Sequence, residues 1–180
     1  MALFGGLNTF ASTFFTFSDY LKPALRMSGL MNLPVLYIFT HDSFMIGEDG
    51  PTHQCIEQLW GIRAIPNITL FRCYNNQEIL AAYTYYFKTK KPTVIVLSKH
   101  VGKTSSTSLK DAVHGGYIIS KEQTKLDVQI VATGMEVETA LNVQNLLKEQ
   151  NIGARVVSMP SANEFMKQTD NYKNKVLENG

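Results

Sequence analysis

The chain has 180 residues, of which 44% are hydrophobic and 18% charged, and its net charge is +2. This balance is typical of a soluble globular protein with one ordinary domain or two small ones. The small, scattered positive charge excludes a nucleic-acid-binding stripe, no apolar run is long enough to span a membrane, and the N-terminus lacks the basic segment of a signal peptide.

Helix-like and strand-like apolar patterns alternate along the chain. Phe14, Phe17 and Leu21 fall near helical spacing, which predicts a first helix over residues 12–31 that includes Pro23. The further expected helices span residues 55–62, 77–88 and 136–149, and the expected strands span 35–39, 68–71, 93–97, 116–120, 128–132 and 154–158. This order predicts an α/β fold with a mostly parallel sheet and flanking helices, followed by a partial second α/β domain.

The domain organisation is predicted from a polar stretch at residues 99–114. We expect a first domain over residues 1–105, a linker over 106–125 and a partial second domain over 126–180.

The two cysteines, Cys55 and Cys73, form neither a CxxC pair nor a spacing with histidine that suggests zinc. A disulfide framework is therefore not expected, and a reducing, cytoplasmic setting is the default.

Titratable side chains are concentrated in the loop that follows the strand at 35–39. Residues 40–54 read THDSFMIGEDGPTHQ and include His41, Asp49 and His53. In parallel α/β folds, function collects in loops at the carboxyl ends of strands, and histidine titrates near neutral pH. The loop therefore suits a hydroxylated, anionic small molecule. A capped turn at Asp49-Gly50-Pro51 explains the same residues at even odds, and a metal site built from His41, Asp49 and His53 matches no dedicated motif.

The motif THDS followed by GEDGPTHQ closely resembles the transketolase signature, and the flanking residues extend the resemblance over nearly the whole chain. The matching segments include Ser12-Thr13-Phe14, Ala24-Leu25-Arg26, Glu57-Gln58, Pro66-Asn67, Leu97-Ser98, Gly115-Gly116-Tyr117, Ala132-Thr133-Gly134 and the run from Ala154 to Pro160. Deoxyxylulose phosphate synthases also carry a DGPTH-like core, but they are not expected to carry THDS or Glu48. These two features favour transketolase or its relative dihydroxyacetone synthase.

The resemblance implies a transferase that moves a two-carbon ketol group from a ketose phosphate to an aldose phosphate, with thiamine diphosphate as cofactor. The first domain would be the pyrimidine-binding domain, and the second would be part of the C-terminal domain. By the same resemblance, Phe17 would stack on the aminopyrimidine ring, with Phe14 and Tyr20 completing the pocket on an aromatic helix. A helix face packed in the core is the structural alternative for these three residues.

The resemblance also implies the substrate-binding residues. His53 would contact the substrate near the reacting carbonyl, Asp49 would bind a substrate hydroxyl, and His41 would help to bind the phosphate. Lys99 stands where the family places an arginine for that phosphate, and it keeps the charge without the bidentate fork.

The family's activating glutamate and its diphosphate-binding domain, which holds Mg²⁺ or Ca²⁺, have no expected counterpart in this chain. We therefore expect a truncated or split enzyme that is inactive alone and whose complete form is a homodimer. Its partners would be sugar phosphates and a second subunit or the missing N-terminal portion, with no nucleic acid and no membrane. The alternative is a non-catalytic remnant, or a split-subunit fragment, that acts by associating with a partner chain.

Two short patterns are expected to have no function. Asp49-Gly50 and Asn75-Asn76 lie at about the spacing of the family's metal motif, but Glu48 replaces its first glycine. Gly102-Lys103-Thr104 mimics the end of a P-loop without the required earlier glycine.

Overall fold

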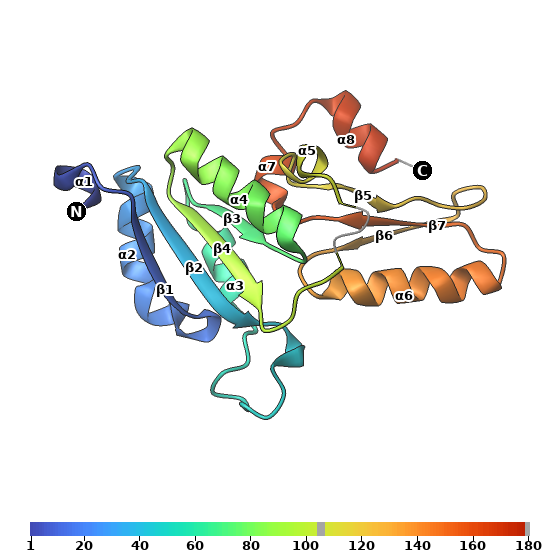
Figure 1. The fold of residues 1–180 in the computed structure, drawn as a ribbon, viewed down its shortest axis with the longest axis horizontal. Helices are drawn as coiled ribbons and strands as arrows, with labels where there is room; N and C mark the ends of the chain where they lie inside the picture. Colours follow the sequence, from blue (N-terminus) through green and yellow to red (C-terminus); the bar gives the residue numbers. More distant parts are fainter. Residues whose placement is uncertain (104–106, 179–180) are drawn as a thin grey trace.

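The computed structural model contains two β-sheets that lie side by side, and it describes residues 1–103 and 107–178 (Figure 1). The first sheet has the order β1-β2-β4-β3 and is parallel throughout. The second has the order β5-β7-β6, in which β5 is antiparallel to β7 and β6 is parallel to it. The expected fold class, a mostly parallel sheet with helices followed by a second, smaller α/β unit, is confirmed.

The first unit holds the first four strands and the helices around them. Its elements are α1 (Ala2–Gly5), β1 (Thr9–Phe14), the 3-10 helix η1 (Phe15–Phe17), α2 (Ser18–Leu30), β2 (Val35–Asp42), η2 (Phe44–Ile46), α3 (Gln58–Arg63), β3 (Thr69–Arg72), α4 (Asn76–Thr89) and β4 (Thr93–Ser98).

The second unit holds the smaller sheet. Its elements are α5 (Leu109–Ala112), β5 (Tyr117–Ser120), β6 (Val128–Ala132), α6 (Glu136–Glu149), β7 (Ala154–Ser158), α7 (Ala162–Phe165) and α8 (Asp170–Val176). The strand β5 lies within residues 106–125, the range expected as a linker, and the expected boundary between residues 105 and 106 lies outside the described residues.

The prediction of one helix over residues 12–31 is wrong in its first part. Thr9–Phe14 forms the edge strand β1, which pairs in register with β2 from Thr9↔Val35 to Phe14↔Thr40. Pairing with β2 outweighs the helix-like spacing of Phe14 and Phe17, because strand formation depends on neighbours that a local pattern does not include. The helix α2 begins at Ser18 and continues through Pro23.

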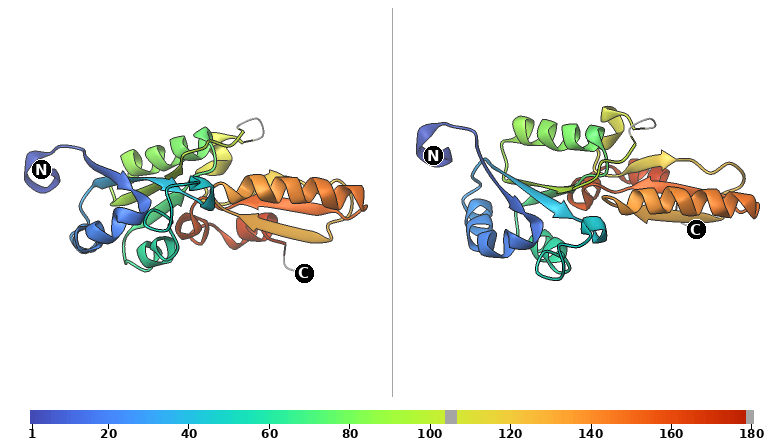
Figure 2. Two further views of the ribbon diagram at one scale, coloured as in Figure 1. Left: turned by 90° about the horizontal axis from the view of Figure 1, so that it is seen from below. Right: turned by 60° about the horizontal axis from the view of Figure 1, so that its bottom comes forward.

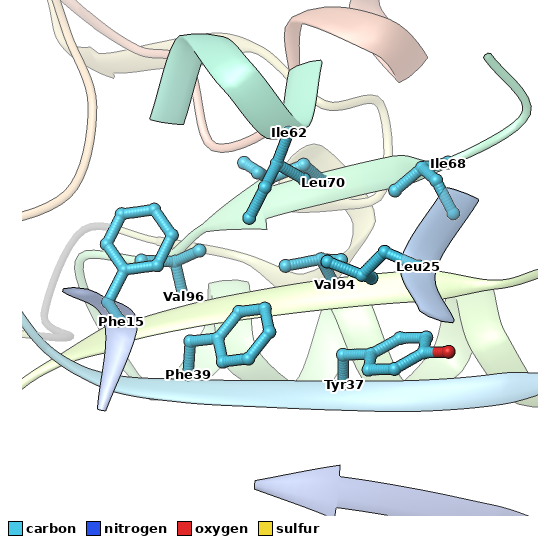
Figure 3. Close-up of a cluster of buried hydrophobic side chains, with 9 residues drawn as sticks. All are labelled: Phe15, Leu25, Tyr37, Phe39, Ile62, Ile68, Leu70, Val94 and Val96. Atoms are coloured by element: carbon cyan, nitrogen blue, oxygen red, sulfur yellow. The ribbon is translucent and has the colours of Figure 1, made fainter. Parts of the chain in front are cut away.

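Alternate side chains of the first sheet fill two separate apolar layers. Figure 3 shows one layer, in which Tyr37 and Phe39 of β2 meet side chains from β3, β4, η1, α2 and α3. Leu36 of β2 and Ile95 of β4 point to the opposite face, where α4 covers them with Ala82 and Tyr86. Burial on both faces explains why these strands are continuous apolar runs in the sequence.

The two units lie next to each other along the chain's long axis (Figure 2), and they share an apolar contact. Tyr74 and Ala81 of the first unit are buried against Tyr117, Met135 and Val156 of the second. Within the described ranges, no helix is both long and apolar enough to cross a membrane.

Candidate functional site

The candidate site lies at the carboxyl ends of β1 and β2, where the loop that contains η2 leaves the sheet (Figure 1). Phe14 is the last residue of β1, Phe17 ends η1, and Tyr20 lies in the first turn of α2. They therefore come from a strand-to-helix junction, rather than from the single aromatic helix expected from the sequence. Because β1 and β2 are parallel and adjacent, this junction lies beside the end of β2, which carries His41.

Two phenylalanines and two histidines form one cluster at this junction. The rings of Phe14 and His41 are stacked, with centroids 3.7 Å apart and planes 25° apart. The His53 ring meets Phe14 edge-on at 5.8 Å and Phe17 edge-on at 5.2 Å. Phe14 and Phe17 are nearly parallel at 5.9 Å, and Tyr20, 85% exposed, lies 6.2 Å from Phe17. The structure thus brings together five of the seven residues expected at the site.

The remaining two expected residues form an ion pair. Lys99 follows the end of β4, and its Nζ lies 3.4 Å from Oδ2 of Asp49 and 3.3 Å from the carbonyl oxygen of Ile46. About a third of each charged side chain is exposed, at 37% for Lys99 and 32% for Asp49. An ion pair this exposed contributes little to stability, so a competing ligand can separate it at small cost.

The backbone around His41 is unusual for residues other than glycine. His41 has φ of 63° and Ser43 has φ of 88°, and the β2–β4 register shifts between Phe39 and Asp42. Such conformations cost about 1–3 kcal/mol each and persist only where the surroundings fix them. Irregular strand ends of this kind re-aim side chains, and here the imidazole faces Phe14.

Each histidine is also held by a neighbouring hydroxyl group. Thr40 Oγ1 lies 2.9 Å from Nδ1 of His41, and Thr52 Oγ1 lies 2.9 Å from Nδ1 of His53. In both rings Nδ1 is therefore engaged, which leaves Nε2 for a ligand. Depending on the tautomer, Nε2 of a neutral imidazole can donate or accept a hydrogen bond.

Cys55 contacts the backbone of both histidines, and its thiol is not in the reactive form. Its Sγ is 3.8 Å from the carbonyl oxygens of both His41 and His53. Burial raises the pKa of the Cys55 thiol to about 12, and the nearby Asp42 carboxylate adds to the rise. The thiol is neutral at physiological pH, whereas a reactive cysteine needs a thiolate.

A buried ionic cluster next to the site was not predicted from the sequence. Arg72, at the carboxyl end of β3, donates to Asp42 and to Glu136 of the second unit. Burial alone would lower the pKa of the Arg72 guanidinium, but Asp42 and Glu136 beside it raise the pKa above its ordinary value. The available signal was a charged residue at the carboxyl end of a buried strand, where function collects in parallel α/β sheets.

The three residues of the alternative metal site do not converge on one point. Asp49 pairs with Lys99, whereas His41 and His53 contact Phe14. Over residues 1–103 and 107–178, no cluster of three or more histidine, cysteine, aspartate or glutamate side chains could hold a metal ion.

The two patterns expected to have no function have ordinary structural roles. Asn75 is fully buried and caps α4 through hydrogen bonds from the amides of Gln77 and Glu78. Gly102 packs against the Tyr74 ring, which a Cβ would meet at 1.9 Å; Thr104 lies outside the described residues.

Comparisons with known proteins agree over nearly the whole chain. The family model for the transketolase pyrimidine-binding domain matches residues 1–103, and that for the transketolase-like C-terminal domain matches residues 115–180. Transketolase from Bacillus subtilis strain 168 is 46% identical, over 98% of this chain and 27% of its own length. A transketolase mutant from Pichia stipitis superposes with a TM-score of 0.91 at 39% identity, over 96% of this chain and 26% of its own.

A further solved structure, described as a split gene transketolase and an inactive beta4 tetramer, superposes with a TM-score of 0.71 at 29% identity. The match covers 87% of this chain and 50% of that one. The chain therefore spans just over a quarter of the length of the first two relatives and half of the third.

Proposed function

The chain belongs to the transketolase family, and on this basis we propose that it supplies the pyrimidine-binding and substrate-binding side of a thiamine-diphosphate-dependent ketol transferase. The observation that carries the proposal is the cluster of Phe14, Phe17, His41 and His53 at the carboxyl ends of β1 and β2. Residues drawn from three segments, the β1–α2 junction, the end of β2 and the loop after it, meet there, as they must where a small molecule is bound between loops.

The aromatic part of the cluster fits the pyrimidine ring of the cofactor. Phe17 would stack on that ring, with Phe14 and Tyr20 beside it, since offset stacking is favourable between flat aromatic groups. When bound, thiamine diphosphate supplies the nucleophilic carbon that accepts the two-carbon group. No described residue of this chain is assigned to the diphosphate or to Mg²⁺ or Ca²⁺, which belong to the family's other domain.

The polar part of the cluster would bind and orient a sugar phosphate. His53 would hold a proton at the reacting carbonyl through Nε2, because its Nδ1 is engaged by Thr52. Asp49 would accept a hydrogen bond from a substrate hydroxyl. His41 and Lys99 would meet the phosphate, and the weak ion pair of Lys99 with Asp49 would give way to the substrate.

We further propose that turnover requires a partner that supplies the diphosphate- and metal-binding domain, and that the complete enzyme is a homodimer. The split-gene relative supports the requirement for a partner, because its description combines a split gene with an inactive beta4 tetramer. Cys55 and Cys73 are free thiols, which suits the reducing, cytoplasmic setting that we propose. A non-catalytic role through association with a partner chain is the alternative.

The test is reconstitution. The chain would be co-expressed with a chain that carries the family's diphosphate-binding domain and activating glutamate, and transfer from xylulose 5-phosphate to ribose 5-phosphate would be measured. We expect no turnover by the chain alone, turnover by the complex, and a loss of at least roughly 100-fold for His53→Ala. His100→Ala, an exposed histidine beyond β4, is the matched control and should leave turnover unchanged.

The other outcomes are equally informative. Turnover by the pure chain would contradict the requirement for a partner, whereas a stoichiometric complex without turnover would favour the non-catalytic role.

A further inference from the structure

The seven expected site residues all lie in the first unit, yet the second unit contacts Arg72 of β3, whose side chain bonds to Asp42 next to His41. Asp42 stands between His41 and Ser43, which both have positive φ. Its carboxylate is buried, with 7% of the side chain exposed. Because residues other than glycine hold positive φ only where their surroundings fix them, whatever fixes Asp42 also fixes the turn that orients His41.

The Asp42 carboxylate is held by Arg72, while the Asp42 backbone pairs with Ser98 of β4. Nε of Arg72 donates to Oδ2 of Asp42 at 2.5 Å, and only 10% of the arginine side chain is exposed. Arg72 ends β3, and β4 lies between β3 and β2 in the sheet. The arginine therefore crosses the end of a whole strand to reach the carboxylate, a span that needs a long side chain.

The second unit forms hydrogen bonds with both the side chain and the main chain of Arg72. Nη1 donates to the carbonyl oxygen of Thr133 at 3.1 Å, and the two terminal nitrogens meet the Glu136 carboxylate at 2.6 and 3.1 Å. The Arg72 amide donates to the carbonyl oxygen of Pro160 at 2.7 Å, and the Thr133 hydroxyl donates to the carbonyl oxygen of Arg72 at 3.3 Å.

The loop of the second unit is also shaped to the guanidinium. Gly134 has φ of 59°, and a Cβ at that position would lie 2.9 Å from Nε of Arg72. A glycine is thus required both by the backbone and by the close approach of the arginine.

We propose that Arg72 is a positioning residue: held by the loop before α6 and by the first residue of α6, it locks Asp42 and thereby the turn that presents His41 to Phe14. The second unit acts on the site through this contact. A guanidinium suits the task because its planar fork bonds several acceptors in fixed directions, whereas a lysine offers one mobile charge. The role of Arg72 in catalysis rests on the proposed function. Its effect on the position of the His41 ring does not, because that effect involves only residues of this chain.

If Arg72 formed only a stabilising ion pair between the units, a substitution would lower stability. The His41 ring would stay in place as long as the chain remains folded. A positioning role requires the His41 ring to move away from Phe14 in a folded variant. The test must therefore report on the ring itself.

The test is proton NMR of the histidine Hε1 signals in the complete 180-residue chain, assigned with single histidine variants. The stack of His41 on Phe14, at 3.7 Å, should displace the His41 signal upfield. His114, stacked on Tyr172 at 4.5 Å in the second unit, provides an internal reference. We expect Arg72→Lys to remove the upfield displacement of His41 and to leave the His114 signal in place.

Arg155→Lys is the matched control. Arg155 is as buried as Arg72, at 8% exposed, and pairs with Glu122 within the second unit. It should leave His41 unchanged. If Arg72→Lys does not fold, Glu136→Gln, which weakens only the outer contact, should shift the His41 signal downfield in part.

An unchanged His41 signal in folded Arg72→Lys, or in Glu136→Gln where Arg72→Lys does not fold, would overturn the proposal. An equal movement of His41 and His114 would do the same. Because the measurement needs no cofactor, substrate or turnover, its failure is distinct from failure of the proposed function.

Discussion

Glu78 joins the two units through a buried carboxylate, and its removal should uncouple them. The side chain lies in α4 of the first unit and is fully buried. It accepts hydrogen bonds from the Tyr74 amide at 2.7 Å, from the Tyr117 hydroxyl at 2.7 Å and from the Ser158 hydroxyl at 2.6 Å. Tyr117 and Ser158 belong to β5 and β7 of the second unit, so Glu78→Ala breaks two bonds between the units.

The expected loss can be worked out from these bonds. A hydrogen bond to a charged group contributes about 1.5–3 kcal/mol, and the variant also leaves the Ser158 hydroxyl without this partner. Part of the loss is offset, because the variant no longer buries a carboxylate. We expect Glu78→Ala to lower the free energy of unfolding by about 2–4 kcal/mol, and Tyr117→Phe to lower it by about half as much.

The pH dependence gives a second signature. Burial raises the pKa of Glu78 above its ordinary 4.5, although hydrogen bonds from Ser158, the Tyr74 amide and Tyr117 oppose the rise. The folded state therefore binds this proton more tightly than the unfolded state. The extra stability that comes from binding this proton is fully present below about pH 4.5 and is lost as the pH rises through the folded-state pKa. Glu78→Ala should remove that dependence.

The assay is urea unfolding followed by two probes. Trp60, the single tryptophan, reports on the first unit, and circular dichroism reports on both. Coincident transitions in the natural chain should separate in Glu78→Ala, because non-coincidence of probes marks the loss of two-state behaviour. Glu149→Ala, at an exposed position on α6, should change neither transition. Coincident transitions together with a loss below about 1 kcal/mol would refute the reasoning.

Three other predictions concern the site, the core and the second unit. Lys99→Arg should lower the KM for sugar phosphates in the reconstituted enzyme through bidentate contact, and an unchanged KM would count against phosphate binding there. Phe39→Ala, at a fully buried position, should lower the free energy of unfolding in urea by about 3–5 kcal/mol. Phe4→Ala, at a position that is 92% exposed, should leave it almost unchanged, and equal losses would contradict the described core. The hydrogen bond from Arg155 lowers the pKa of Glu122 to about 2, so its stabilisation holds above about pH 4.5 and disappears as the pH falls toward 2. Arg155→Met should therefore be destabilising at neutral pH and almost neutral near pH 2, and a loss independent of pH would show that packing dominates.

The sequence predicted most strands because their burial is visible locally. The runs at Val35, Thr69 and Thr93 are apolar on both faces, as strands of a parallel sheet that is covered on both faces must be. The strand β1 was missed because Phe14 and Phe17 are three residues apart across a strand-to-helix junction, which imitates helical spacing.

Within the site, the family resemblance supplied residues that the fold then brings together, as with Phe14 and His41. Neither Arg72 nor its partners could be predicted in the same way. Asp42 and Glu136 are 30 and 64 residues away along the chain, and their contact with Arg72 depends on how the two units dock. No local pattern contains that information, since docking is decided by the packing of Tyr74 and its neighbours.

The most direct test of the central claim is calorimetric titration of thiamine diphosphate into the reconstituted complex. The claim is that Phe17 and its neighbours bind the pyrimidine ring. Phe17→Ala should weaken binding by roughly tenfold, about 1.4 kcal/mol. Phe87→Ala should leave the affinity unchanged, because Phe87 lies on α4 next to Tyr86, whose hydroxyl bonds to Pro34 at the opposite end of the sheet. Equal affinities for the natural chain and Phe17→Ala would contradict the assignment of this cluster as the cofactor site.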